Sequence, residues 1–85
     1  MSRIIVNEDL ATGEFTVHLE QNDKLRLDTS QSCFTEETVH AIISDIVHDD
    51  IGEFLTEDDC IVHTKWDEDS AVSVERVSLI EYLEN

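Results

Sequence analysis

The chain of 85 residues carries 21 Asp and Glu side chains against 5 Lys and Arg, which gives a formal net charge of −16. Its length allows one small domain, residues 1–85, and a hydrophobic fraction of 40% is enough for a core. The charge excludes nucleic acids and anionic membranes as partners, because both would be repelled. The sequence contains no run of about 20 apolar residues, so no membrane span is predicted. The start of the chain lacks a signal-peptide pattern, so we expect a cytoplasmic protein.

The acidic residues are unevenly distributed along the chain. Residues 1–34 hold 6 acidic and 3 basic side chains, whereas residues 35–85 hold 15 acidic and 2 basic ones. Acidic charge alone can serve only to keep a small protein soluble. Its concentration after residue 34 favours instead a surface that binds a basic partner.

The first third of the sequence predicts three short strands. Residues 3–7 are rich in β-branched side chains, and residues 15–20 and 24–28 alternate between apolar and polar side chains. A glycine-containing turn is expected between the first two strands, and a polar connection over residues 29–32 is expected after the third. Together these segments predict a β-meander.

One helix is expected over residues 35–50. Thr35 is the predicted N-cap, and Glu36 and Glu37 lie in the first turn, where the helix dipole favours negative charge. Gly52 is a suitable residue to end the helix. Apolar residues at helical spacing form a single stripe that consists of Val39, Ile42, Ile43, Ile46 and Val47.

The remainder of the chain predicts two further strands. An acidic connection with one hydrophobic anchor covers residues 53–59, and a strand follows at residues 60–66. Residues 72–83 have apolar side chains all round a helical wheel, so we predict a strand to about Leu79 with a bulge near Glu75 and Arg76, although the pattern also leaves a helix open. The order β-β-β-α-β-β predicts an α+β fold, in which one helix packs on one face of a single antiparallel sheet of four to five strands.

No metal site or cofactor is predicted. His40 and His48 share a helix face, but the paired Cys and His spacing of a zinc site is missing. Residues 67–69 begin like a calcium loop, yet Val72 and Ser78 stand where that loop needs glycine and glutamate. Exposed histidines and a solvated turn are the simpler interpretation.

Catalysis is not predicted either. Cys33 and Cys60 are interpreted as reduced thiols in or beside the core, because two isolated cysteines form neither a disulfide framework nor a zinc site. A cysteine paired with a histidine would need an orienting motif, and none is present. We therefore expect a protein that is not an enzyme.

Two stretches of the chain carry a resemblance to a known family. Residues 57–68 contain Val62, His63 and Thr64 followed by an aromatic residue and Asp-Glu, and residues 24–37 lead from a strand into a helix that begins with paired glutamates. Together they cover 26 of the 85 residues. Both stretches are similar to the uracil-DNA glycosylase inhibitors of Bacillus phages, which are small acidic proteins that mimic DNA.

The resemblance implies two sets of partner-binding residues. Glu36 and Glu37 match the start of the family's contact helix, while Thr29 stands where the family has a contact glutamate, with Asp28 the nearest substitute. With the other acids near the helix and the 67–70 turn, the predicted acidic set is Asp28, Glu36, Glu37, Asp45, Asp49, Asp67 and Glu68. The implied apolar pocket consists of Phe34 and Val62, extended along the helix by Thr38, Ala41 and Ile42.

These observations predict an acidic DNA mimic that occludes the DNA-binding groove of a basic DNA-binding enzyme, with uracil-DNA glycosylase as the named candidate. Carboxylates would take the phosphate sites, and an apolar anchor would add affinity that charge alone does not supply. One alternative is an immunity or anti-defence protein against a nuclease of the restriction, CRISPR or toxin type. Another is a solubility or accessory domain that forms a homodimer through a free sheet edge.

Overall fold

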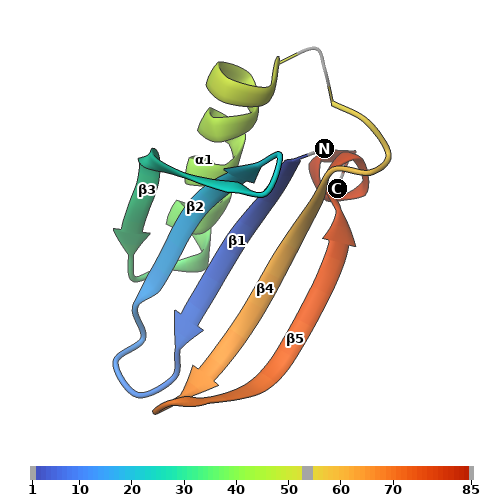
Figure 1. Ribbon diagram of the computed structural model, residues 1–85. Coiled ribbons are helices and arrows are strands. Elements are labelled where there is room, and N and C mark those ends of the chain that lie inside the picture. Colours follow the sequence, from blue (N-terminus) through green and yellow to red (C-terminus); the bar gives the residue numbers. More distant parts are fainter. Residues whose placement is uncertain (1, 53–54, 85) are drawn as a thin grey trace.

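The computed structural model describes residues 2–52 and 55–84. They form one five-stranded sheet in the order β3-β2-β1-β4-β5, with helical segments on one side of it (Figure 1). The α+β fold and the order β-β-β-α-β-β are confirmed. The elements are β1 (Ser2–Asp9), β2 (Phe15–Gln21), β3 (Lys24–Cys33), α1 (Glu36–Ile46), the π-helical segment η1 (Val47–Ile51), β4 (Cys60–Asp67), β5 (Ser70–Ser78) and α2 (Leu79–Glu84).

The sheet is mixed, so the expectation of a wholly antiparallel sheet is wrong for one pair of strands. β1 and β4 run parallel, with Ile4 opposite Ile61 and Val6 opposite His63, whereas the other three pairs are antiparallel. The physical reason is the crossover. β3 runs in the same direction as β1, α1 carries the chain back along the sheet, and β4 then enters beside β1 in the direction of β1.

Three details of the strands differ from the expectation. The predicted connection at residues 29–32 is strand, because Gln31 and Ser32 pair with Val17 and Thr16 of β2. The edge position leaves the side chains of residues 30–32 in solvent, whereas Thr29 is buried. The predicted bulge at Glu75 and Arg76 is wrong, since the register of β5 shifts at Val72, opposite Lys65 and Trp66. The strand ends at Ser78, and the helix that the pattern left open forms only after it, as the short helix α2.

The predicted helix begins where its signals place it. The Thr35 hydroxyl accepts a hydrogen bond from the Thr38 N–H at 3.2 Å, which confirms the N-cap. Helical structure continues through η1 to Gly52, whose φ of 61° is the positive value that favours glycine. The stripe is also confirmed, because Val39, Ile42, Ile43 and Ile46 are all buried.

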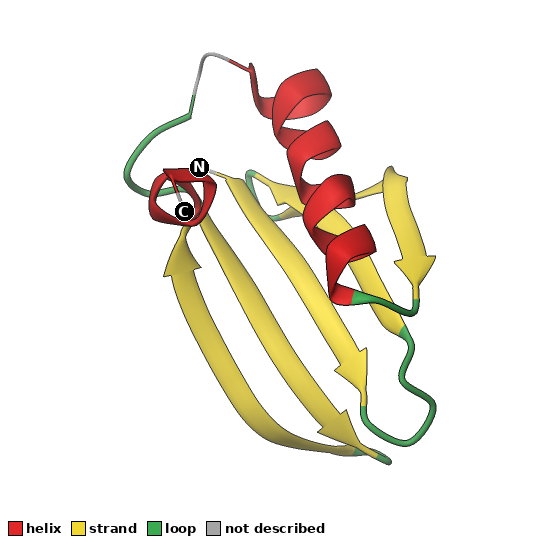
Figure 2. Ribbon diagram, turned by 180° about the vertical axis from the view of Figure 1, so that it is seen from behind, coloured by secondary structure: helices red, strands yellow, loops and turns green. Residues whose placement is uncertain are grey.

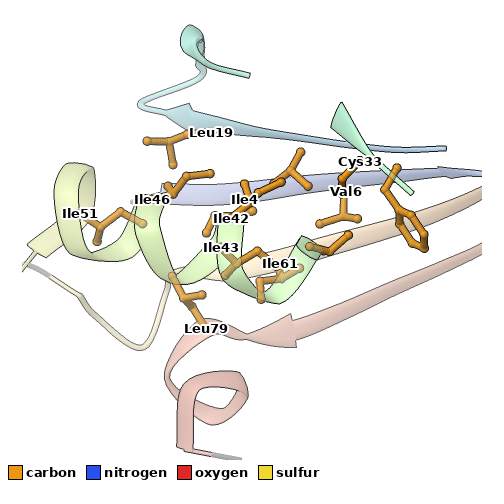
Figure 3. Packing of buried hydrophobic residues seen from close by; sticks show 13 residues of the cluster. Ile4, Val6, Leu19, Cys33, Ile42, Ile43, Ile46, Ile51, Ile61 and Leu79 are labelled. Carbon is orange, nitrogen blue, oxygen red and sulfur yellow. The ribbon is translucent and has the colours of Figure 1, made fainter. Parts of the chain in front are cut away.

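The core lies between α1 and one face of the sheet. Alternate residues of β1 and β2 point toward the helix stripe, and Ile61 and Leu79 complete the layer (Figure 3). Figure 2 shows α1 and α2 on this same side of the sheet. Among the described residues, no element packs against the other side, which faces the viewer in Figure 1. The predicted acidic connection includes residues 53 and 54, which lie outside the described residues.

Candidate functional site

Four of the predicted acidic residues lie on the helical segment and are exposed: Glu36, Glu37, Asp45 and Asp49. The buried stripe packs one side of α1 against the sheet. These four carboxylates therefore project from the remaining, solvent-facing sides of the helix. Asp45 and Asp49 are one turn apart and share a side. The acidic first turn needs no compensation from its own helix, because the dipole there is positive.

Asp67 and Glu68 form the β4–β5 turn, and both are exposed. Glu68 has a φ of 56°, which is a left-handed conformation at the tip of the turn. Asp28 has different surroundings. Its carboxylate forms an ion pair with Arg26 at 2.9 Å, and this hydrogen bond lowers the pKa of Asp28 below its ordinary value.

The basic side chains compensate few of these carboxylates. Arg3 pairs with Glu20 and with Asp23, and Arg26 pairs with Asp28 and with Asp50 at 3.6 Å. Asp49 forms an ion pair with a histidine, His48, at 3.1 Å. Within the described part of the chain, no Lys or Arg forms an ion pair with Glu36, Glu37, Asp45, Asp67 or Glu68. These five residues and Asp49 are called the acidic surface below.

The five residues of the implied apolar pocket do not come together. Ile42 is 6% exposed and belongs to the core. Val62 lies opposite Ile5 in the sheet and alternates with the core residue Ile61, so it points away from α1. Phe34 is 69% exposed just before the helix, and Thr38 and Ala41 are exposed on α1. A pocket with this lining is therefore not formed, since helix and strand place its members on different sides of the sheet.

A groove exists instead between α1 and the β4–β5 ribbon. Its volume is about 300 Å³, its floor is apolar, and Glu36, His63, Lys65, Glu75 and Tyr82 line its rim. Behind it, His63 Nε2 lies 3.1 Å from Glu8 Oε1. The groove combines residues from both ends of the chain, and Glu36 alone among them was a predicted site residue.

Tyr82 connects α2 to α1 at the edge of this groove. Its hydroxyl lies 2.9 Å from His40 Nδ1, and the two rings are in contact. Burial, with a smaller contribution from the Glu36 carboxylate, raises the pKa of Tyr82. The hydroxyl therefore stays protonated at neutral pH and can donate to the imidazole. This contact fixes the side of α1 that carries Glu36.

One acidic residue has a purely structural position that the sequence did not reveal. Asp59 is 2% exposed, and its carboxylate accepts hydrogen bonds from the Ser2 N–H at 2.6 Å and the Thr56 N–H at 2.7 Å. Its backbone carbonyl accepts from the Leu79 N–H at 2.9 Å. The Thr-x-x-Asp spacing of Thr56 and Asp59 is the signal that could have distinguished it from the neighbouring acids.

The remaining features concern metal binding, the two cysteines and membrane insertion. Across residues 2–52 and 55–84, no three His, Cys, Asp or Glu side chains are grouped so as to hold a metal ion. Cys33 and Cys60 are both buried free thiols. In the same residues, no helix has the length and apolar character needed to cross a membrane.

Comparison with protein-family models, with curated proteins and with solved structures finds no match to this chain. The resemblance to the glycosylase inhibitors stays a prediction that depends on the two sequence stretches. The case for a function depends on the acidic surface itself.

Proposed function

We propose that the protein is an acidic DNA mimic that binds the DNA-contacting surface of a basic enzyme and occludes it. The observation that carries this proposal is the acidic surface: exposed carboxylates on α1, η1 and the β4–β5 turn that no Lys or Arg of the described chain compensates. Because no basic side chain neutralises these carboxylates within the described chain, their negative charge is available to attract a basic partner. No turnover and no cofactor are needed.

The charge density of the molecule is close to that of duplex DNA. The longest dimension is 37 Å, and the formal net charge is −16. A DNA duplex carries one charge per about 1.7 Å, or about 22 charges over the same length. A basic groove that attracts DNA would therefore attract this protein at a comparable rate, with a similar dependence on salt.

The helix also provides a suitable spacing. Asp45 and Asp49 are four residues apart, or about 6 Å along a helix axis. Two successive steps along one DNA strand rise about 6.8 Å. Side chains of a partner that contact alternate phosphates can therefore reach successive turns of α1 and η1.

An apolar contact next to the acids supports the same proposal. Charge by itself gives fast association and salt-sensitive affinity, whereas tight complexes usually contain an aromatic or apolar anchor. Phe34 is 69% exposed directly before the acidic first turn, so its ring is accessible to an apolar pocket of a partner. Phe34 is therefore the anchor in this proposal.

The first test is an inhibition assay with the purified protein. Uracil-DNA glycosylase and a panel of restriction, CRISPR and toxin nucleases are assayed with increasing amounts of protein, at low and high salt. We expect inhibition of at least one enzyme, weakened by salt and by excess duplex DNA. Inhibition confined to a toxin or defence nuclease identifies the immunity or anti-defence role. No inhibition of any enzyme contradicts the proposal and favours the solubility or accessory role.

A pair of charge reversals then locates the binding face. Glu36→Lys with Glu37→Lys should weaken inhibition at least about tenfold, which corresponds to 1.4 kcal/mol. The matched control is Glu57→Lys with Asp58→Lys, which changes the net charge equally at two exposed residues far from the first turn of α1 in sequence. Equal weakening by both pairs would show that total charge matters and the helix face does not.

A further inference from the structure

The side of the sheet that faces away from α1 is apolar at its centre. The register places Ile5, Val62, Trp66 and Val74 on this side, with Val72 in the adjoining bulge, and these five residues define the open face. Val72 is 56% exposed and Val74 63% exposed. A contiguous apolar area on a monomer surface usually marks an interface.

The centre of the open face is also poor in charge for a protein of net charge −16. Arg3 and Glu20, which flank it, neutralise one another in an ion pair. His18 lies on the same side, and burial lowers its pKa, so it is neutral at pH 7. Depletion of charge around an aromatic and aliphatic centre is the composition of an interface core. The centre of the face therefore offers little to a cationic partner, whereas a second acidic chain can approach it.

The charges that remain lie at opposite ends of this face. Arg76 pairs across from Val62, and no acid of the described chain forms an ion pair with it. At the other end, a hollow of about 220 Å³ is lined by Trp66 together with the carboxylates of Asp9, Glu14 and Glu68. The Trp66 indole N–H is held by Asn7 Oδ1 at 3.0 Å. The face therefore has a cationic end and an acidic, aromatic end.

We infer that the open face binds a second copy of this chain, sheet against sheet, about a two-fold axis that runs across the strands near Thr64. Val62 and Trp66 are four residues apart, or about 14 Å along the strand. An axis midway between them places Arg76 of each copy over the Trp66 and Glu68 end of the other. An axis parallel to the strands would instead stack acidic end on acidic end, so the charges select the first arrangement.

The area of the sheet allows a dimer interface of less than standard size. Five strands span about 24 Å and eight residues span about 27 Å, so the whole side of the sheet, on which the open face occupies β1, β4 and β5, measures about 650 Å². A standard interface buries about 800 Å² on each partner, and weaker ones bury less. The carboxylates of α1 and η1 lie on the side of each sheet that faces away from the partner, which limits repulsion between the two copies.

Sedimentation velocity over a range of protein concentrations tests the dimer. We expect the mass to rise from 9.7 kDa to twice that value. The single tryptophan, Trp66, should shift its emission to the blue over the same range, because the partner covers it. Added salt should strengthen the dimer by screening net repulsion, the opposite of its effect on a complex with a basic enzyme. A mass of 9.7 kDa up to about 1 mM would overturn the inference.

Charge swaps test the arrangement itself. Arg76→Glu and Glu68→Arg should each weaken the dimer at least about tenfold, and the double swap should restore it. Asp45→Arg, on the outer side of α1, is the matched control and should leave the dimer intact or make it tighter. A dimer formed through a free sheet edge would leave Trp66 emission unchanged and would not be restored by the double swap, which would also overturn the inference. If Arg76→Glu does not fold, Arg76→Gln gives the same comparison with a smaller loss.

Discussion

The two faces of the sheet differ in the burial and in the charge of their side chains. On the helix side Ile4 and Leu19 are 0% exposed, whereas their strand neighbours Ile5 and His18, on the open side, are only half-buried. The helix side ends in uncompensated carboxylates on α1, while the open side is apolar at its centre and carries Asp9, Glu14 and Glu68 at one end. Because successive side chains of a strand point to opposite faces, alternate residues of the same strand form the core and the residues between them form a surface with other properties.

The largest effect expected from this difference concerns packing. Ile43→Ala should lower the free energy of unfolding by about 2–5 kcal/mol, because Ile43 is 1% exposed beneath α1. Val74→Ala on the open face is the control and should change it by about 0.5 kcal/mol or less at low protein concentration. Urea denaturation measures both. A loss from Val74→Ala as large as that from Ile43→Ala would show that the open face is packed in solution.

Asp59 breaks the rule that acids of this chain face solvent. Asp59→Ala leaves the buried N–H group of Ser2 and the partly buried N–H group of Thr56 without their acceptor, so we expect a loss of about 1–3 kcal/mol in thermal or urea unfolding. The neighbouring Asp58→Ala, at an exposed position, removes the same charge and should be neutral or slightly stabilising. Similar results for the two variants would argue that the Asp59 contacts contribute nothing.

The N-cap controls the acidic first turn of α1. Thr35→Ala removes the acceptor for the Thr38 N–H and should cost about 1 kcal/mol. Thr35→Ser keeps that acceptor and should retain most of the stability. Hydrogen exchange of the first-turn amides measures the local effect, which should exceed the change at Ile46. Uniform loss of protection along α1 would assign Thr35 a global role instead.

The features that the sequence predicted are those with local signals. Thr35, the apolar stripe and Gly52 each specify the same helix, and all three were confirmed. The parallel pairing of β1 with β4 was missed because strand patterns fix which face is buried and carry no information on which strands are neighbours. Asp59 was missed because, among so many acidic residues, the composition does not indicate which one is buried.

The candidate site was predicted unevenly for the same reason. The acids on α1 and in the β4–β5 turn needed only a helix face and a turn, and the structure places them in solvent. The apolar pocket needed distant residues to converge. Ile42 already belonged to the core stripe, and Val62 alternates with the core residue Ile61, so neither was available to it. The groove beside Glu36 and the open face both depend on strand order, which no local pattern contains.

The smallest expected effect belongs to His18, on the open face. Burial lowers the pKa of His18 below its ordinary value of 6.5, and the nearby Glu20 raises it in part. The folded chain therefore binds this proton less readily than the unfolded chain. Its contribution to stability is complete above about pH 6.5 and is lost as the pH falls through the lower pKa of the folded state.

His18→Gln should accordingly flatten the fall of melting temperature between neutral and mildly acidic pH, a range above the ordinary carboxylate pKa values of about 4. The other three histidines are common to both proteins, so the difference between the two curves isolates His18. Identical curves would show that its burial has no consequence. Because a second copy stacked on the open face would bury His18 further, the difference should grow with protein concentration. On a face that stays open it should not depend on concentration at all.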